Sequence, residues 1–339
     1  MSFMMTIEKE DRVSSELLVG GKPFLGQAQA RKLLSRSLAS GRLAHAYLFQ
    51  GPEGIGKQLF ARGLTAAVNC AAGKGLAACG ICSGCRKFAS GTHPDFLLVS
   101  PEKGAIKIDQ VRELIKKLSY APYEAGMRVV LLEDVHTMRR EAANSLLKTL
   151  EEPPEDNLLI LTADSARTIL PTISSRCQAI PFYPLTLEQT VEVIVRENKE
   201  LDRETAMLLA RLAEGSPGRA LLLHRKDLVN FGMRVVELIA DPAKGGGQHV
   251  GLFLQTAEAM AGLKEDLSSL FGLLRLWLRD GLFSASCQEV TTSIMKTRKD
   301  WNSEQYFAKL QAIEQAEKEL NRNCNRTLVC EVLLFQLQA

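Results

Sequence analysis

Residues 45–57 read HAYLFQGPEGIGK, an apolar run followed by a glycine-rich loop that ends in a lysine. The apolar run is typical of a buried strand, and Gly-x4-Gly-Lys is the spacing of a phosphate-binding loop between a strand and a helix. Glycines let backbone amides curl around an anion, the following helix points its positive end there, and the lysine adds a charge. The alternative is a glycine-rich turn that only enters a helix. The candidate phosphate contacts are Gly51, Gly54, Gly56 and Lys57.

The surrounding sequence, residues 24–183, alternates short apolar runs with helical patterns, as α/β domains with a largely parallel sheet do. Val111, Leu114 and Leu118 fall on one face of a predicted helix. Beyond residue 183 strand-like runs disappear and helical patterns continue to the end of the chain. Strands are predicted at residues 46–50, 96–100, 129–132 and 158–162.

The predicted fold class is α/β plus all-α, in three domains. A P-loop α/β domain covers residues 1–183, a small helical domain covers 184–225, and a helical C-terminal domain covers 226–339. The sequence GSPG at residues 215–218 interrupts the helical pattern of the second domain, and DPAKGGGQ at 241–248 is the most linker-like stretch.

Composition and charge set limits on the function. The 339 residues are 46% hydrophobic and 24% charged, which suits a globular chain with several cores. A net charge of +3 neither requires nor excludes nucleic acid, so other chains would share any DNA contact. Because no apolar run reaches about 18 residues and no signal peptide is evident, we expect a cytoplasmic protein with no membrane partner.

Four of the eight cysteines crowd together at the spacing C-x8-C-x2-C-x2-C. Four thiolates at short separations can close a tetrahedron around Zn²⁺, and four protein ligands leave no open position for chemistry. In a large cytoplasmic protein such clustering favours metal over disulfides. The alternative is four reduced cysteines in the core. The sequence predicts a structural zinc module over residues 70–85, with the ligands Cys70, Cys79, Cys82 and Cys85.

Residues 128–138, RVVLLEDVHTM, are an apolar strand that ends in two acids, Glu133 and Asp134. In ATPases that have a phosphate-binding loop, the first of two such acids orients Mg²⁺ and the second activates the attacking water. The usual order of the two acids is Asp then Glu. Gln58 stands after the loop lysine, where a Ser or Thr hydroxyl would bind Mg²⁺. Because these roles tolerate little misplacement, hydrolysis is expected to be defective; a solvated acidic turn is the alternative. The candidate nucleotide contacts include Gln58, Glu133, Asp134 and Thr162.

Several blocks together resemble the clamp-loader family of AAA+ ATPases, in particular the bacterial gamma/tau and delta-prime subunits. The resemblance covers residues 24–225, and a weaker similarity is found at residues 321–334. Its blocks are FLGQ (24–27), HAYLFQGPEGIGK (45–57), NSLLKTLEEPP (144–154), LPTISSRC (170–177) and NRNCNRTLVCEVLL (321–334). The resemblance implies that the second domain is a lid and the third a collar, and the family has the same cysteine spacing in its zinc module.

The resemblance also implies partners and a role for one arginine. The partners are gamma/tau and delta subunits in a heteropentamer, which sets the sliding clamp on primed DNA at the nucleoid-associated replisome. Arg176, within Ser-Arg-Cys, is implied to reach into a neighbouring subunit's ATP site in trans. From the residues alone, Arg176 could equally be a cation at a helix C-terminus. Gly218 stands where motor subunits carry a sensor arginine, and Arg219 is one position off.

Three features together favour a scaffold subunit of the delta-prime type: Gln58, the order of Glu133 and Asp134, and Gly218. Such a subunit would bind ATP and Mg²⁺ weakly or would not hydrolyse the bound ATP. No polymerase site is expected in this chain. The Gly51–Lys57 loop itself supports the alternative, an active ATPase motor of the gamma/tau type. A third hypothesis, an unrelated zinc-containing nucleotide-binding enzyme, is disfavoured by the SRC and LEEPP blocks.

Overall fold

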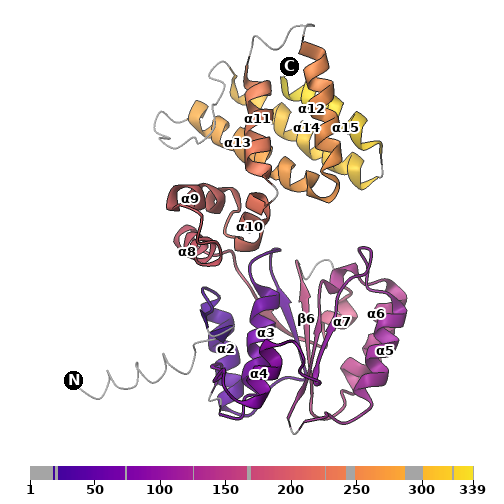
Figure 1. Ribbon diagram of the computed structural model, residues 1–339. Coiled ribbons are helices and arrows are strands. Elements are labelled where there is room, and N and C mark those ends of the chain that lie inside the picture. The colour runs from indigo at the N-terminus through magenta and orange to yellow at the C-terminus, as the bar shows by residue number, and fades with distance from the viewer. Residues whose placement is uncertain are drawn as a thin grey trace, which may run out of the picture. The chain divides into compact units, whose positions relative to one another are not determined.

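The computed structural model describes residues 18–19, 22–72, 75–124, 126–165, 169–225, 227–241, 249–286, 301–322 and 324–338. The chain divides into two compact units (Figure 1). One unit runs to Lys199 and includes Glu214–Arg219, and the other comprises Glu200–Ala213 and Ala220 onward. Because this division falls inside the expected lid, the domain boundaries at 183 and 225 stay predictions.

A parallel sheet organises the first unit. In the described part of the chain it has five strands in the order β4-β5-β6-β3-β7, all paired in parallel. The strand that comes first in sequence, β3, therefore lies between β6 and β7. The predicted parallel sheet is confirmed. The strands are β3 (Ala46–Gln50), β4 (Phe96–Val99), β5 (Arg128–Leu132), β6 (Asn157–Ala163) and β7 (Gln178–Pro181).

Helices cover both faces of this sheet. Figure 1 shows α2 and α3 on one side and α5 and α6 on the other. A two-stranded antiparallel ribbon, β1 (Leu18–Val19) with β2 (Lys22–Pro23), precedes them. The helices are α2 (Ala28–Ala39), α3 (Lys57–Val68), α4 (Ser83–Ala89), α5 (Ile108–Leu118), α6 (Arg140–Glu151), α7 (Pro171–Ser174) and α8 (Leu187–Glu197), with a 3-10 turn η1 (Val135–Thr137).

The side chains of β3 alternate between two hydrophobic cores. Leu48 belongs to the core that α5 and α6 cover, whereas Phe49 belongs to the core on the α2 and α3 side. The Phe49 ring lies 5.7 Å from Phe60 and 4.9 Å from Phe182 between centroids. Burial on both faces explains why the inner strands β3, β5 and β6 are largely apolar runs. It also fixes the carboxyl end of β3, where the glycine loop starts.

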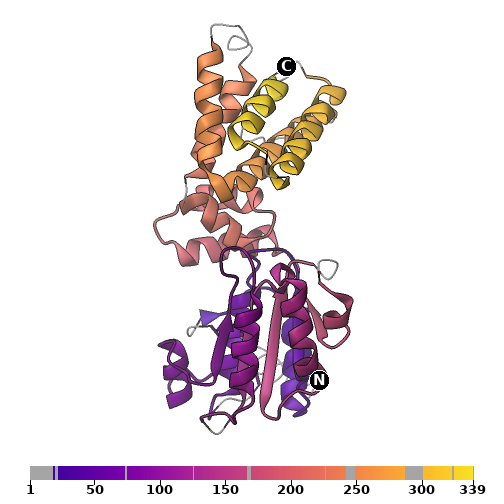
Figure 2. The same cartoon turned by 90° about the vertical axis from the view of Figure 1, so that its right-hand side faces the viewer.

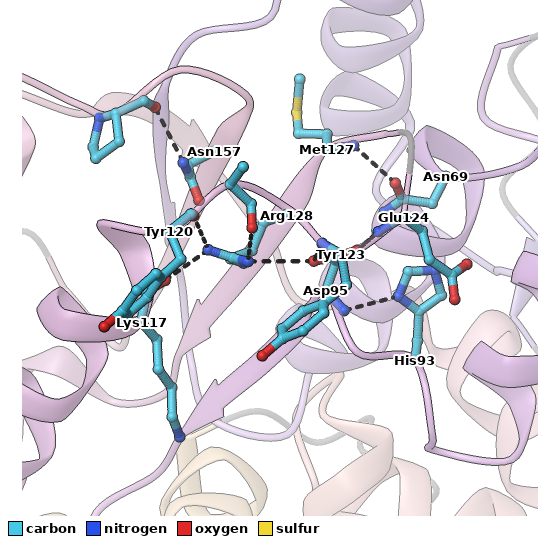
Figure 3. A network of polar contacts seen from close by, with 12 residues as sticks. Asn69, His93, Asp95, Lys117, Tyr120, Tyr123, Glu124, Met127, Arg128 and Asn157 are labelled. Carbon is cyan, nitrogen blue, oxygen red and sulfur yellow. Dashed lines mark hydrogen bonds and ion pairs between the residues drawn. The ribbon is translucent and has the colours of Figure 1, made fainter.

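A buried ion pair holds the segment between α5 and β5 (Figure 3). Arg128 and Asp95 are each 2% exposed in their side chains, and Arg128 Nη2 lies 3.5 Å from Asp95 Oδ1. The Asp95 carboxylate also accepts hydrogen bonds from the amides of Tyr123 and Glu124, at 2.8 and 2.9 Å. The Arg128 guanidinium donates to three carbonyl oxygens, those of Lys117, Tyr120 and Ala121.

In the second unit every regular element of the described residues is a helix, as the pattern beyond residue 183 predicts. The apolar contacts of α12–α15 are close: Phe253 stacks on Phe335 at 5.5 Å between ring centroids. Figure 2 shows these helices packed side by side. The helices are α9 (Arg203–Leu212), α10 (Pro217–Arg225, shared between the units), α11 (Leu228–Ala240), α12 (Val250–Gly262), α13 (Leu267–Ser286), α14 (Ser303–Asn321) and α15 (Arg326–Gln338), with a 3-10 turn η5 (Lys264–Asp266).

Most of the expected linker, residues 242–248, lies outside the described ranges. Among the described helices, none combines the length and apolarity that crossing a bilayer requires.

The Arg128 contacts predict a large stability effect. Arg128→Met should lower the free energy of unfolding of the first unit by about 3–5 kcal/mol, because it leaves the Asp95 carboxylate buried without its cation. Arg112→Met is the matched control, since Arg112 is 67% exposed in its side chain and should change stability by less than about 0.5 kcal/mol.

Urea unfolding followed by far-ultraviolet circular dichroism measures the change. Fluorescence adds an internal control, because both tryptophans, Trp277 and Trp301, belong to the second unit. A loss for Arg128→Met no larger than that for Arg112→Met would show that the ion pair does not hold this segment.

Candidate functional site

The glycine loop connects β3, an interior strand of the sheet, to α3, as predicted. Gly54 has a φ of +75°, and a Cβ there would lie 2.4 Å from Ser216 Oγ. At Gly51 a Cβ would lie 2.3 Å from the carbonyl oxygen of Phe182. Gly56, with a φ of +97°, immediately precedes α3. Any larger residue at Gly51 or Gly54 would therefore push the loop away from neighbouring main chain.

Lys57, the first residue of α3, is 6% exposed and makes internal contacts. Its Nζ donates to the carbonyl oxygens of Gly51 and Pro52 and forms an ion pair with Asp164 Oδ1 at 3.1 Å. The cation that a phosphate would need is thus shared by a carboxylate and two carbonyls. Gln58, the next residue, has an exposed side chain.

The two acids after β5 lie in different surroundings. Glu133 is 9% exposed and accepts a hydrogen bond from Ser100 Oγ at 2.8 Å. Asp134 has a left-handed backbone, with φ +50°, and its amide donates to Thr162 Oγ1 at 3.0 Å. The hydroxyl oxygen of the buried Thr162 is therefore engaged with the main chain of Asp134. The structure brings Thr162 and Asp134 together but gives Glu133 a separate partner.

Sequence reasoning missed two polar residues at this edge, His136 and Asp164. Ligand atoms of Asp134, His136 and Asp164 lie within 4.8 Å of one another, and His136 Nε2 is 3.8 Å from Asp164 Oδ2. A signal was available for Asp164, because it directly follows β6 and the carboxyl ends of parallel strands share one edge of the sheet.

Residues 215–218 contact the glycine loop directly. The Gly218 amide donates to the Gly54 carbonyl oxygen at 2.9 Å, and Ser216 Oγ donates to the Glu53 carbonyl oxygen at 2.8 Å. A Cβ on Gly218 would lie 2.8 Å from Gly54 Cα. The absence of a side chain at Gly218 thus permits backbone-to-backbone contact with the loop.

The four clustered cysteines converge, as predicted. Their Sγ atoms lie within 4.8 Å of one another. Successive backbone amides donate to sulfur: Cys79 N to Cys70 Sγ at 3.2 Å, and Cys82 N to Cys79 Sγ at 3.4 Å. Since Zn–S bonds of about 2.3 Å put tetrahedral sulfurs roughly 3.8 Å apart, this arrangement fits a zinc ion. No disulfide occurs among the cysteines of the described residues.

The pKa values of the clustered thiols differ, because their surroundings differ. The Cys85 amide, then the Ala71 amide, stabilise the Cys82 thiolate and lower the pKa of Cys82 to about 6. Amide hydrogen bonds from Ile81 and Cys82 lower the pKa of Cys79, whereas burial raises the pKa of Cys85 to about 12. Amides that stabilise thiolates favour a bound cation, because the thiolate is the metal-binding form.

The cysteine cluster and the glycine loop lie at opposite ends of α3. The helix begins at Lys57 and ends at Val68, two residues before Cys70. At about 1.5 Å per residue its length is roughly 18 Å. The cysteine cluster is therefore separate from the edge of the sheet that carries the glycine loop, which agrees with a structural role.

Arg176 lies just beyond the short helix α7. Its side chain is 34% exposed and pairs with Glu151 Oε1 at 2.5 Å through Nη2. Nη1 donates to the Thr172 carbonyl oxygen at 2.9 Å. Sequence reasoning did not anticipate Glu151, although it belongs to the LEEPP block.

Comparisons with known proteins find relatives for most of the chain. The family described as "DNA polymerase III, delta subunit" matches residues 26–186. DNA polymerase III subunit delta' of Pseudomonas aeruginosa is 34% identical over 86% of this chain and 91% of its own length. The Bacillus subtilis subunit delta' is 30% identical over 92% of this chain and 96% of its own length.

A further relative belongs to the tau type. Subunit tau of Escherichia coli is 34% identical over 73% of this chain but only 36% of its own length. Among solved structures, a gamma subunit-related protein from Thermotoga maritima covers 91% of this chain and 98% of its own, with a TM-score of 0.46 and 18% identity. On the strength of the two delta' relatives, the chain belongs to the family of DNA polymerase III clamp-loader subunits.

Proposed function

We propose that the chain is a delta'-like scaffold subunit of a bacterial clamp loader, which lends Arg176 to a neighbour's ATP site and hydrolyses little or no ATP itself. The observation that carries the proposal is a contrast between two cations. Lys57 is buried on internal acceptors, whereas the Arg176 side chain is 34% exposed. Lys57 is therefore paired within its own chain, whereas Arg176 is accessible to a partner.

Several contacts argue against hydrolysis in the chain's own loop. A bound phosphate would have to compete with Asp164 for Lys57. Gln58 supplies no short hydroxyl for Mg²⁺, and the Gly218 amide is bonded to the Gly54 carbonyl in the loop. Nucleotide with Mg²⁺ would at most bind weakly here, with Gly51, Gly54, Gly56, Lys57, Gln58, Glu133, Asp134 and Thr162 as the candidate contacts.

In this proposal Zn²⁺ is a structural ion held by the cysteine cluster. The convergence of four sulfurs and the lowered pKa values of Cys79 and Cys82 support it. A closed four-thiolate site would fasten the loop between α3 and α4, whose described residues 70–72 and 75–82 contain no helix or strand. Such a site would leave no coordination position for chemistry.

The proposed assembly follows the relatives. Gamma/tau and delta subunits would be the partners in a heteropentameric AAA+ ring that sets the sliding clamp on primed DNA in the cytoplasm, at the replisome. Residues 184–225 would form the lid, and the C-terminal helices from residue 226 the collar that joins subunits. The candidate alternative is an active gamma/tau-like motor, favoured by the tau relative and by the Gly51–Lys57 loop.

The proposal predicts negligible ATP hydrolysis by the purified chain. Metal placement is disrupted by Gln58 and by the order of Glu133 and Asp134, and no neighbour supplies an arginine. A coupled ATPase assay on wild-type protein and on Lys57→Ala should give the same background rate. Robust turnover that Lys57→Ala abolishes would favour the motor alternative.

Elemental analysis should find about one Zn²⁺ per chain in protein purified without added zinc, because sites of this type bind with roughly 10–16 kcal/mol of apparent free energy. Cys82→Ser should lose the ion and make the 70–85 segment sensitive to protease. Cys324→Ser is the matched control, since Cys324 is exposed and outside the cluster. Metal-free protein with unchanged protease resistance would exclude the zinc site.

Arg176→Ala should leave the chain folded and able to assemble, but should lower the clamp- and DNA-stimulated ATPase of the reconstituted complex. The loss should be partial, because other sites in the ring keep their own arginines. Arg176→Lys should restore little, since an ammonium cannot reproduce the planar, multi-donor guanidinium. Lys57→Ala is the control and should matter much less. The roles are inverted if Lys57→Ala cripples the complex while Arg176→Ala is silent.

A further inference from the structure

Two nitrogens of the Arg176 guanidinium, Nη1 and Nη2, donate to acceptors in the same chain. Nη2 pairs with Glu151 Oε1 at 2.5 Å, and Nη1 donates to the Thr172 carbonyl oxygen at 2.9 Å and to Ser175 Oγ at 3.3 Å. The Glu151 and Arg176 side chains are 49% and 34% exposed. An exposed ion pair of this kind contributes little to stability, so its main physical effect is on the orientation of the arginine.

Both partners of this pair project from elements anchored in the core. Glu151 is the last residue of α6, next to the buried Leu150. Arg176 follows α7, and its amide donates to the carbonyl oxygen of Ile173, which is 1% exposed. Because the two backbones are fixed independently, the carboxylate can set the direction of the guanidinium plane.

The contacts with the chain leave part of the guanidinium available. Arginine carries five N–H donors in one plane, and in the described part of the chain Nη1 and Nη2 have acceptors whereas Nε has none. A phosphoryl group could therefore accept from Nε and from the second Nη2 hydrogen while Glu151 stays bound. Holding such a donor in place before the reaction avoids reorganisation in the transition state.

We propose that Glu151 is a positioning residue for Arg176, which orients the guanidinium toward the phosphoryl group of a neighbouring subunit. This inference rests on the proposed function, in which Arg176 acts in trans. Glu151 itself would not touch the nucleotide. It would act only through Arg176, so its effect should vanish when Arg176 is absent.

The test is a double-mutant cycle in the reconstituted complex. Glu151→Ala should cause at least half of the loss in stimulated kcat that Arg176→Ala causes, with little change in the KM for ATP. Glu151→Gln should retain more activity than Glu151→Ala, because the amide oxygen still accepts a hydrogen bond. Glu151→Ala combined with Arg176→Ala should match Arg176→Ala alone. Glu152→Ala is the matched control, since Glu152 is the adjacent exposed acid and should behave as wild type.

A second readout uses the isolated chain and does not depend on ATPase activity. Phenylglyoxal modifies free guanidinium groups, and peptide mass spectrometry measures its rate at Arg176. The rate should rise in Glu151→Ala but not in Glu152→Ala. An unchanged rate in Glu151→Ala would overturn the positioning role.

The two proposals fail in different ways. If Arg176→Ala lowers the ATPase while Glu151→Ala is silent, the positioning role is wrong and the arginine finger stands. An effect of Glu151→Ala that persists in the Arg176→Ala background would also overturn it, because Glu151 would then act independently. If Arg176→Ala itself is silent, the arginine-finger proposal fails and the positioning role fails with it.

Discussion

The position of β3 between β6 and β7, with its side chains buried on both faces of the sheet, is the constraint on which the glycine-loop edge of the sheet depends. Because β3 pairs with both β6 and β7, its glycine loop emerges between the ends of two other strands. Packing of Phe49 against Phe60 and Phe182 fixes where that loop begins. The same parallel arrangement brings Thr162 to the amide of Asp134 and Asp164 to Lys57.

At this edge of the sheet, the buried lysine and two carbonyls of the glycine loop are bonded to other groups of the same chain. Asp164 forms an ion pair with Lys57. The Ser216 hydroxyl and the Gly218 amide donate hydrogen bonds to carbonyl oxygens of the glycine loop. At the ends of α6 and α7 the arrangement differs, because the guanidinium of Arg176 is held by Glu151 and still reaches solvent. These two features support the proposal that the chain completes a neighbour's ATP site and hydrolyses little or no ATP itself.

Much of this could be predicted from the sequence, because it depends on local patterns. Apolar runs specified the strands, glycine spacing specified the loop, and the C-x2-C-x2-C run brought its thiols together. The partners of Lys57, Gly218 and Arg176 could not be predicted in this way. The contacts of Lys57 with Asp164, of Gly218 with Gly54 and of Arg176 with Glu151 join segments that are distant in the chain. No periodicity of the sequence indicates which carboxylate or carbonyl will lie beside each of them. Only Asp164 left a usable signal, at the end of a predicted strand.

The most direct test is a structure of the assembled clamp loader with a transition-state analogue of ATP hydrolysis and Mg²⁺. We expect the Arg176 guanidinium to lie within about 3 Å of the phosphoryl analogue in the neighbouring subunit, with Lys57 of this chain still paired to Asp164. Analogue and Mg²⁺ bound in this chain's own Gly51–Lys57 loop, with Arg176 turned away from any nucleotide, would contradict the division between a committed lysine and an available arginine.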